Sequence, residues 1–317
     1  MANYKDIHGT QIEVVSSDPS NPITGQVWYN TTDSKLKGFT SSPAGSWATT
    51  NAMNAARAAI GGLANSTQTA ALAFGGETPP GTDVTGASEQ YNGTSFSEVG
   101  DLNTGRRCSG GAGDVTAGLA AGHQTTGSVA VTETWDGSSW TEVNDLNSAR
   151  AYGRCMGIQT SALYFGGQPG IATNESWNGS SWTEGGDLNT GRMQLAAAGQ
   201  SNTAALAFGG RQPPTVYAQT ELWNGSAWSE VNDLNTGRIV LEGCGTTTAA
   251  LAFGGGGALT EDWDGTSWTE VNDLNVDHGN FSGAGTTTAA LAAGAGGSTA
   301  SEEWTAPTTS TVEFDVS

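Results

Sequence analysis

Arginine and glutamate recur at fixed positions along this chain and are its first candidates for chemistry. The arginines are Arg57, Arg106, Arg150, Arg192 and Arg238, and the glutamates, each two residues before an aromatic residue, are Glu89, Glu133, Glu175, Glu221, Glu261 and Glu302. A guanidinium group binds a carboxylate through two parallel hydrogen bonds. Because the two residue types recur together, we predict structural Arg–Glu pairs rather than a catalytic site. His278 stands where a sixth arginine is expected, and we interpret it as a tolerated substitution.

The segment Asp-Leu-Asn-Thr-Gly, which precedes three of these arginines, could offer oxygen ligands to a metal ion. It occurs at residues 101–105, 187–191 and 233–237. Its Asp-x-Asn-x-Gly spacing is similar to the start of a calcium-binding loop, but the terminal bidentate glutamate of such a loop is missing. Asx-type hydrogen bonds in a turn explain the same residues. We therefore expect neither a metal nor another cofactor, and calcium remains the alternative.

Catalytic motifs are not apparent in the sequence. The histidines His8, His123 and His278 fall outside the usual nucleophile and metal-binding patterns. A pair of carboxylates acting on sugars is conceivable, but sequence spacing alone cannot place two of them at the required separation. The cysteines Cys108, Cys155 and Cys244 are odd in number and without paired spacing, so we interpret them as small buried residues. We expect a protein that is not an enzyme.

A repeated unit positions these residues. Its copies run over Tyr91–Arg106, Trp135–Arg150, Trp177–Arg192, Trp223–Arg238 and Trp263–His278, and the last residue always follows the first by 15 positions. Structural roles are also assigned to the paired tryptophans Trp135, Trp140, Trp177, Trp182, Trp223, Trp228, Trp263 and Trp268. Self-similarity with a period of a few tens of residues is typical of solenoids and propellers.

Each unit from Asn51 onward predicts four strands. A small-residue strand such as 193–199 follows the arginine, and an apolar strand ending in Gly-Gly, such as 203–210, comes next. An Asn-Gly or Asp-Gly turn then joins a strand with Glu-x-Trp to a strand with Trp-x-Glu, and its glycine supplies the positive φ of a tight hairpin. The predicted fold is an all-β propeller of four-stranded blades.

The two ends of the chain determine the number of blades. Residues 1–50 predict a meander of short strands at 11–15, 25–30, 35–39 and 46–50, and residues 51–317 carry the repeats. We favour seven blades, with residues 1–50 as a divergent blade or attachment segment and Thr311–Val316 as the fourth strand of the last repeat. Six blades are the alternative, because Trp47 and Arg57 have the same spacing as Trp140 and Arg150 and could complete the last repeat.

The order of arginine, small-residue strand, Gly-Gly strand and paired aromatic residues is similar to the Kelch repeat, over residues 51–305. The segment GQVWYNTTDSKLKGF, followed by Trp47, resembles short β modules near the N-termini of bacteriophage tail and fibre proteins. The Ala/Gly/Thr/Trp-rich repeats likewise resemble those of marine phage proteins. These resemblances imply a virion structural protein in a tail, fibre or other surface-exposed component. Its partners would be other virion proteins, bound through residues 1–50, and a host-surface glycan or protein.

Length variation points to one face for recognition. The distance from the residue before Gly-Gly to the next aromatic residue varies from 10 to 17 positions among the repeats, while neighbouring segments barely vary. Loops on a rigid scaffold often carry binding residues, although neutral drift explains the variation equally well. The candidate binding residues are Thr78, Pro79, Pro80, Asp83, His123, Gln124, Gln168, Pro169, Arg211, Gln212 and Tyr217. A free propeller that binds or processes glycans is the alternative function, and Tyr217 is its one aromatic candidate in these loops.

The charge balance limits the partners. Eleven basic against 31 acidic residues give a net charge of −20, which disfavours nucleic acid and anionic membranes. No apolar run is long enough for a membrane helix, and the first residues lack the features of a signal peptide. We therefore expect synthesis in a host cytoplasm without cleavage, no membrane insertion, and a final location in the virion.

Overall fold

The computed structural model describes residues 12–23, 25–41, 45–79, 83–107, 110–124, 127–307 and 309–314. The described residues form strands and no helix, which confirms the all-β prediction. The chain divides into two compact units, residues 1–45 together with 306–317, and residues 46–305. We call them the small-sheet unit and the repeat unit. This division differs from the expected boundary after residue 50, because residues 46–49 belong to the repeat unit and the C-terminal segment does not.

The repeat unit contains six four-stranded antiparallel sheets, each with its four strands in sequence order apart from the last. The first is β5 (Gly61–Gly62), β6 (Ala71–Phe74), β9 (Ser88–Tyr91) and β10 (Phe96–Glu98); the second is β11 (Gly110–Asp114), β12 (Ala117–Gln124), β13 (Ser128–Trp135) and β14 (Trp140–Val143). The third is β15 (Arg154–Ile158), β16 (Ser161–Phe165), β17 (Asn174–Trp177) and β18 (Trp182–Glu184); the fourth is β19 (Ala196–Ser201), β20 (Ala204–Phe208), β23 (Thr220–Trp223) and β24 (Trp228–Val231). The fifth is β25 (Glu242–Gly245), β26 (Ala250–Phe253), β27 (Thr260–Trp263) and β28 (Trp268–Val271); the sixth is β29 (Ser282–Gly285), β30 (Ala289–Ala295), β31 (Ser298–Thr305) and β4 (Ser46–Thr49).

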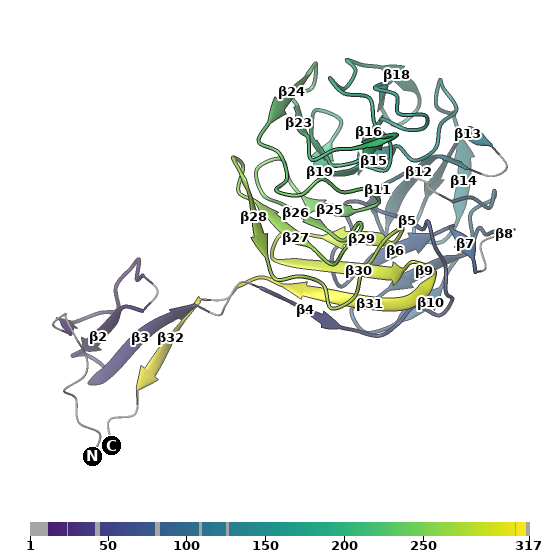
Figure 1. Ribbon diagram of the computed structural model, residues 1–317. Helices are drawn as coiled ribbons and strands as arrows, with labels where there is room; N and C mark the ends of the chain where they lie inside the picture. The colour runs from purple at the N-terminus through teal and green to yellow at the C-terminus, as the bar shows by residue number, and fades with distance from the viewer. Residues whose placement is uncertain are drawn as a thin grey trace. The chain divides into compact units, whose positions relative to one another are not determined.

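The sheets have a propeller-like arrangement. The first strand of each sheet lies beside the first strand of the next, and β29 lies beside β5. Figure 1 shows these first strands near the centre of the repeat unit and the fourth strands, such as β24 and β28, at its outside. Small residues permit the close approach of the first strands. A Cβ atom on Gly111 would lie 2.2 Å from the carbonyl oxygen of Gly62 on the neighbouring sheet.

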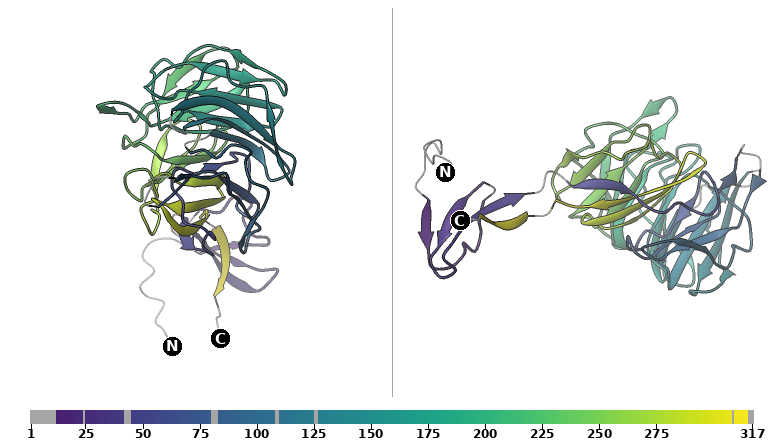
Figure 2. Two further views of the ribbon diagram at one scale, coloured as in Figure 1. Left: turned by 90° about the vertical axis from the view of Figure 1, so that its right-hand side faces the viewer. Right: turned by 90° about the horizontal axis from the view of Figure 1, so that it is seen from below.

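The sixth sheet takes its outer strand from the N-terminal side of the chain. β4 pairs antiparallel with β31, with Trp47 opposite Trp304, and Figures 1 and 2 show the purple β4 lying along the yellow C-terminal strands. Trp47 packs against Trp304 and Phe253 at centroid distances of 5.6 and 5.1 Å. Trp140, Trp228 and Trp268 likewise each pack against a tryptophan of their own sheet and a phenylalanine of the preceding sheet. The favoured expectation that Thr311–Val316 completes this repeat is therefore wrong, because that segment has no tryptophan to fill the position.

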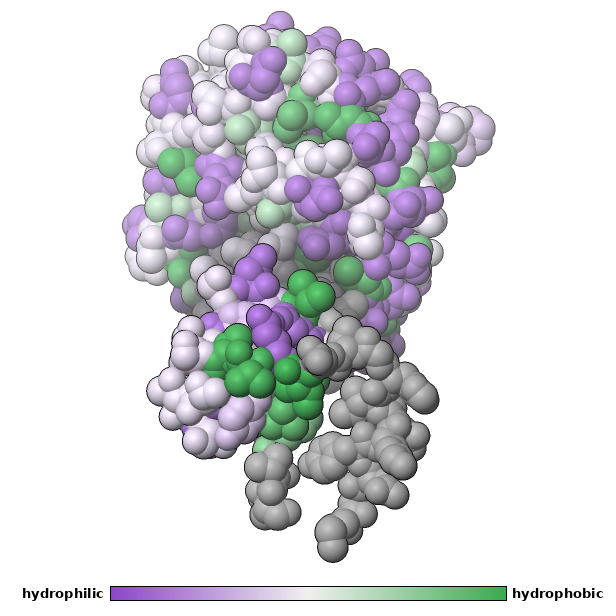
Figure 3. Space-filling view, turned by 90° about the vertical axis from the view of Figure 1, so that its left-hand side faces the viewer, coloured by the Kyte–Doolittle hydropathy of each residue, from purple (hydrophilic) through white to green (hydrophobic). Residues whose placement is uncertain are grey.

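The C-terminal strand pairs in the small-sheet unit instead. There β1 (Glu13–Val15), β2 (Val27–Asn30), β3 (Lys35–Ser41) and β32 (Thr309–Phe314) form one four-stranded sheet. β1 runs parallel to β2, whereas β2–β3 and β3–β32 are antiparallel. The chain thus leaves this sheet after β3, builds the whole repeat unit, and returns to the same sheet at β32. Figure 3 shows the surface of the small-sheet unit, where green apolar side chains lie among polar ones.

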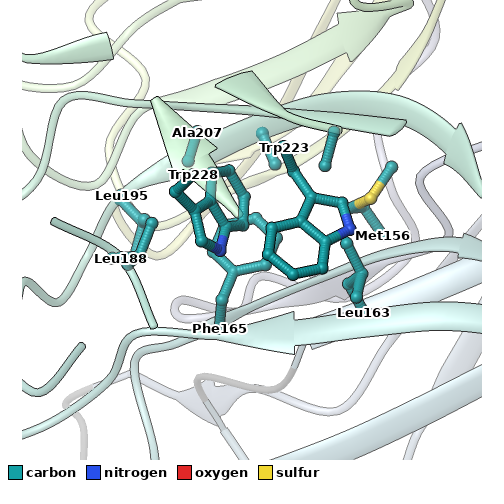
Figure 4. Packing of buried hydrophobic residues seen from close by; sticks show 10 residues of the cluster. Met156, Leu163, Phe165, Leu188, Leu195, Ala207, Trp223 and Trp228 are labelled. Carbon is teal, nitrogen blue, oxygen red and sulfur yellow. The ribbon is translucent and has the colours of Figure 1, made fainter. Parts of the chain in front are cut away.

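The apolar core of the repeat unit lies between adjacent sheets. In one such layer, the rings of Trp223 and Trp228 pack at a tilt of 41° with centroids 5.4 Å apart, and Phe165 of the preceding sheet meets Trp228 edge-on at 4.9 Å. Met156, Leu163 and Leu195 complete the layer (Figure 4). A sheet in this arrangement has neighbours on both faces, so its second strand, such as Ala250–Phe253, is buried on both sides.

The outer tryptophan of each pair also donates a hydrogen bond to the preceding sheet. The indole nitrogens of Trp140, Trp182, Trp268 and Trp47 donate to hydroxyl oxygens of Ser88, Thr132, Thr220 and Thr260 at 3.3, 3.1, 3.1 and 3.0 Å. Trp228 is the exception, because Asn174 occupies the equivalent position. Within the described residues, neither the Trp228 indole nitrogen nor the Asn174 side-chain oxygen has a hydrogen-bond partner.

We expect Asn174→Thr to increase the free energy of unfolding by about 1 kcal/mol, because the new hydroxyl can accept the buried Trp228 N–H. Thr220→Val is the matched opposite change and should decrease it by about 1–3 kcal/mol, because the Trp268 N–H loses its acceptor. Urea titration followed by tryptophan fluorescence measures both. A decrease in stability for Asn174→Thr, or no decrease for Thr220→Val, would show that the tryptophan does not depend on a hydroxyl acceptor.

Candidate recognition face

The recurring arginines are buried and form the ion pairs that the spacing predicts. Arg57, Arg150, Arg192 and Arg238 contact Glu89, Glu175, Glu221 and Glu261 at 2.8, 2.6, 3.0 and 3.0 Å, and Arg106 contacts Glu133. His278 makes the equivalent contact with Glu302 at 3.1 Å. Burial lowers the pKa of Arg106 to about 10, and it also lowers the pKa of Arg57, Arg192 and Arg238, while the paired glutamates oppose the shift.

The same glutamates hold the segment before each arginine. Glu133 accepts hydrogen bonds from the backbone and side-chain nitrogens of Asn103, both at 2.8 Å, and equivalent bonds join Glu175 to Asn147 and Glu221 to Asn189. Asp101 accepts from the backbone nitrogen of Ser88 at 3.1 Å. These polar side chains therefore stabilise the turn before each arginine through hydrogen bonds. Among the described residues there is no group of three or more His, Cys, Asp or Glu side chains arranged to hold a metal ion.

The Gly-Gly dipeptides connect each sheet to the next corner. The backbone nitrogen of Gly76 donates to the carbonyl oxygen of Arg106 at 2.7 Å. A Cβ atom on Gly75 would lie 2.4 Å from the same oxygen, and Gly75 has a φ of 64°. Glycine is required here by both conformation and space. Since the variable loops follow Gly-Gly, they lie at the same end of the repeat unit as the arginine corners. We call this end the loop face.

The predicted binding residues lie on this face, with two outside what can be described. Thr78 and Asp83 stand in the short hairpin of β7 (Glu77–Thr78) and β8 (Asp83–Val84), and Thr78, Pro79 and Asp83 are exposed, whereas Pro80 lies outside the described residues. His123 is in β12, but its side chain is outside the described set. Gln168, Pro169 and Gln212 are exposed, whereas Gln124, Arg211 and Tyr217 are half-buried.

Only some of these residues are brought together. Gln212, in the hairpin of β21 (Arg211–Gln212) and β22 (Thr215–Val216), lies against Gly170, so the loops of the third and fourth sheets touch. Gln124 accepts a hydrogen bond from the Tyr152 hydroxyl at 3.1 Å, which links the second and third sheets. Thr78 and Tyr217 belong to the first and fourth sheets, which are separated by the second and third sheets in the chain order.

A central cavity of about 60 Å³ opens among the residues that follow the corners. Its polar lining includes Tyr152, Arg154, Gln194, Glu242 and Asn280, none of which was among the predicted binding residues. Ala59, Tyr152, Gln194, Val240 and Asn280 have φ angles of 54–61°. Backbone hydrogen bonds join neighbouring members, as in Gln194 to Tyr152 at 2.8 Å and Val240 to Gln194 at 3.0 Å.

An ion pair joins the third and fifth sheets beside this cavity. Both guanidinium NH₂ groups of Arg154 donate to the carboxylate of Glu242, one of them at 2.5 Å, and the side chains are only 13% and 8% exposed. Burial raises the pKa of Glu242, and Arg154 acts in the opposite direction. The equivalent positions in the other sheets are Gly61, Gly110, Ala196 and Ser282. The sequence signal that could have indicated this pair is that Arg154 and Glu242 are charged where the other repeats have a small residue.

Neither a scan against models of protein families nor a search of curated proteins finds a match for this chain. No helix among the described residues is long and apolar enough to cross a membrane.

Arg150→Ala should lower the free energy of unfolding by about 3–5 kcal/mol, because Glu175 would remain buried without its counter-charge. Arg211→Ala is the matched control. Arg211 lies on the same face but forms no ion pair within the described residues, so its loss should change stability by no more than about 0.5 kcal/mol. Denaturant titration compares the two, and similar values for both would argue against the corner pair as a main source of stability.

Arg154→Gly alone should cost about 3 kcal/mol of stability, whereas Arg154→Gly combined with Glu242→Ser should be nearly neutral, since those residues fill the same position in other sheets. The single variant should also lose stability as pH rises above the ordinary glutamate pKa towards the raised pKa of buried Glu242. An acid whose folded pKa is raised binds more protons when folded, so its ionisation favours unfolding. Denaturant titrations at pH 4 and pH 7 measure both effects, and additive costs would refute the pairing.

Proposed function

We propose that this chain is a non-enzymatic structural protein of a bacteriophage virion, in a tail, fibre or other surface-exposed component. In this proposal the small-sheet unit attaches the chain to other virion proteins and the repeat unit is displayed. The observation that supports this proposal most is the division of the chain into two compact units. The segment that resembles phage tail and fibre modules, residues 25–39, lies in a compact unit of its own, apart from the repeats.

We also infer that the repeat unit is a closed, Kelch-like propeller of six blades. The contact between β29 and β5 supports closure, and so does an apolar cluster that combines Leu291 and Ala284 of the last sheet with Ile60 and Phe96 of the first. The outer strand β4 joins the N-terminal side of the repeats to their C-terminal side. Such a ring leaves no long open sheet edge on a displayed particle surface.

The burial and hydrogen bonds of the corner arginines and glutamates support a structural role for them rather than a catalytic one. Each arginine and glutamate is buried and hydrogen-bonded within its own corner. The unequal loops on the loop face are the surface we assign to recognition of a host-surface glycan or protein. The acidic character of the chain supports protein or neutral glycan partners rather than nucleic acid or an anionic membrane.

A free glycan-binding or glycan-processing propeller is the second candidate. It is favoured by the central cavity, where the phenol of Tyr152 lies with the amides of Gln194 and Asn280. Aromatic rings and amides are common in sugar-binding sites because they combine an apolar face with hydrogen-bonding groups. The cavity of about 60 Å³ is small for a sugar ring, which favours the virion proposal.

Mass spectrometry of purified phage particles should find this chain at a fixed copy number per particle. Electron microscopy with an antibody against the repeat unit should place it at the particle surface. Glycan-array binding by the purified chain, compared with its Tyr152→Ala variant, tests the alternative. Absence from particles, together with glycan binding that Tyr152→Ala abolishes, would replace the virion role with the glycan-binding one.

A further inference from the structure

Two residues that line the central cavity have buried polar atoms without a hydrogen-bond partner among the described residues. One atom is the acceptor oxygen Oε1 of Gln194. The other is the donor nitrogen Nε of Arg154, whose two NH₂ groups both donate to Glu242. A buried polar group without a partner is costly, and in folded proteins such a group usually meets a water molecule or a ligand.

Gln194 is the more specific of the two signals. Corner arginines such as Arg57 and Arg192 also have an Nε without a partner, so this feature alone does not mark a site. Gln194, in contrast, stands on a backbone that is fixed on both sides. Its φ is 57°, its nitrogen donates to the carbonyl oxygen of Tyr152 at 2.8 Å, and its carbonyl oxygen accepts from Val240 at 3.0 Å. The amide of Gln194 is therefore presented to the cavity region by a fixed main chain.

Apolar side chains form much of the remaining lining. Ile60, Leu195, Leu241 and Phe281 line the cavity and are buried, and the half-buried Tyr152 adds an aromatic ring. The volume of about 60 Å³ admits a group of only a few non-hydrogen atoms. A group that fits must therefore be small and must combine a hydrogen-bond donor, an acceptor and an apolar end.

We propose that the cavity binds the acetamido group of an uncharged, N-acetylated amino sugar. The acetamido N–H donates to Oε1 of Gln194, the acetamido oxygen accepts from Nε of Arg154, and the methyl group contacts the apolar lining. The sugar ring stays outside the cavity on the loop face, so the small volume is no obstacle to binding. An uncharged ligand also suits a chain with a net charge of −20.

Other small groups match the cavity less well. A carboxylate has no donor for Gln194, and it would approach the carboxylate of Glu242. An ammonium group has no acceptor for the Nε–H of Arg154. A primary amide supplies both a donor and an acceptor but has no methyl group for the apolar lining. The inference rests on the proposed recognition of a host-surface glycan and names the class of sugar. It does not depend on where the chain stands in the virion.

Titration of the full-length chain with two trisaccharides tests the proposal. The trisaccharide of β-1,4-linked N-acetylglucosamine is compared with cellotriose, in which a hydroxyl replaces each acetamido group. The wild type should bind the first more tightly by about tenfold or more, because only the acetamido group satisfies both buried atoms. Saturation-transfer NMR with the wild type should show the acetyl methyl protons as the most strongly saturated protons of the ligand.

Gln194→Leu removes the acceptor with little change in side-chain volume, and it should weaken binding of the N-acetylated trisaccharide by about tenfold or more. Gln200→Leu is the matched control. Gln200 is an exposed residue of β19 outside the cavity lining, so the same substitution there should leave the affinity unchanged. Urea titration followed by tryptophan fluorescence checks that both variants fold. If Gln194→Leu does not fold, the ligand comparison and the NMR spectra of the wild type decide.

Equal affinity for the two trisaccharides, or binding of neither, would overturn the proposal and leave the cavity to ordered water. A folded Gln194→Leu variant that binds like the wild type would do the same. These outcomes are separate from the virion role. A chain that is present in particles but does not distinguish the trisaccharides contradicts only this inference, and a chain that distinguishes them but is absent from particles contradicts only the virion role.

Discussion

The buried pair of a corner arginine and a third-strand glutamate is the interaction on which the repeat depends. In each corner the glutamate holds the arginine and the asparagine three residues before it, so one carboxylate fixes the path from the fourth strand of one sheet into the first strand of the next. Charges buried in this way are costly unless they are paired. The ion pair therefore fixes the conformation of the corner. In that conformation the carbonyl oxygen of the corner residue accepts a hydrogen bond from a Gly-Gly amide, as Arg106 does from Gly76.

The corners also explain why the two ends of the repeat unit differ. At the tight-turn end, Asn-Gly and Asp-Gly hairpins have one length, and Asn178 or Asp136 accepts the turn amides. At the loop face the chain between Gly-Gly and the third strand is held at its base, where Glu77 and Ala58 exchange backbone hydrogen bonds, and the longest loops form the β7–β8 and β21–β22 hairpins. Beyond that base, length can change without disturbing the core. The small-sheet unit has the opposite character, since it contains little core and relies on one polar cluster around Asp18.

Local spacing was sufficient to predict some features and insufficient for others. The Arg150–Glu175 pair could be predicted because both residues sit at fixed offsets from a tryptophan, and the same holds for the strand pairs around each turn. The Arg154–Glu242 pair could not, because sequence does not state which first strands face one another across the centre. The partner of the C-terminal strand was missed for a related reason. Both Trp47 and Phe314 lie in short alternating segments, and only packing distinguishes the tryptophan position from the edge of another sheet.

The sequence by itself determined the four-stranded repeat, the buried corner pairs and the confinement of loop variation to one face. These properties depend on contacts within one repeat or between consecutive repeats, which a fixed spacing records. Tertiary structure alone decided that Ser46–Thr49 completes the last sheet and that β32 returns to β3. Those features join residues more than two hundred positions apart, and at such separations the choice between strands of similar pattern rests on which one buries the right side chains.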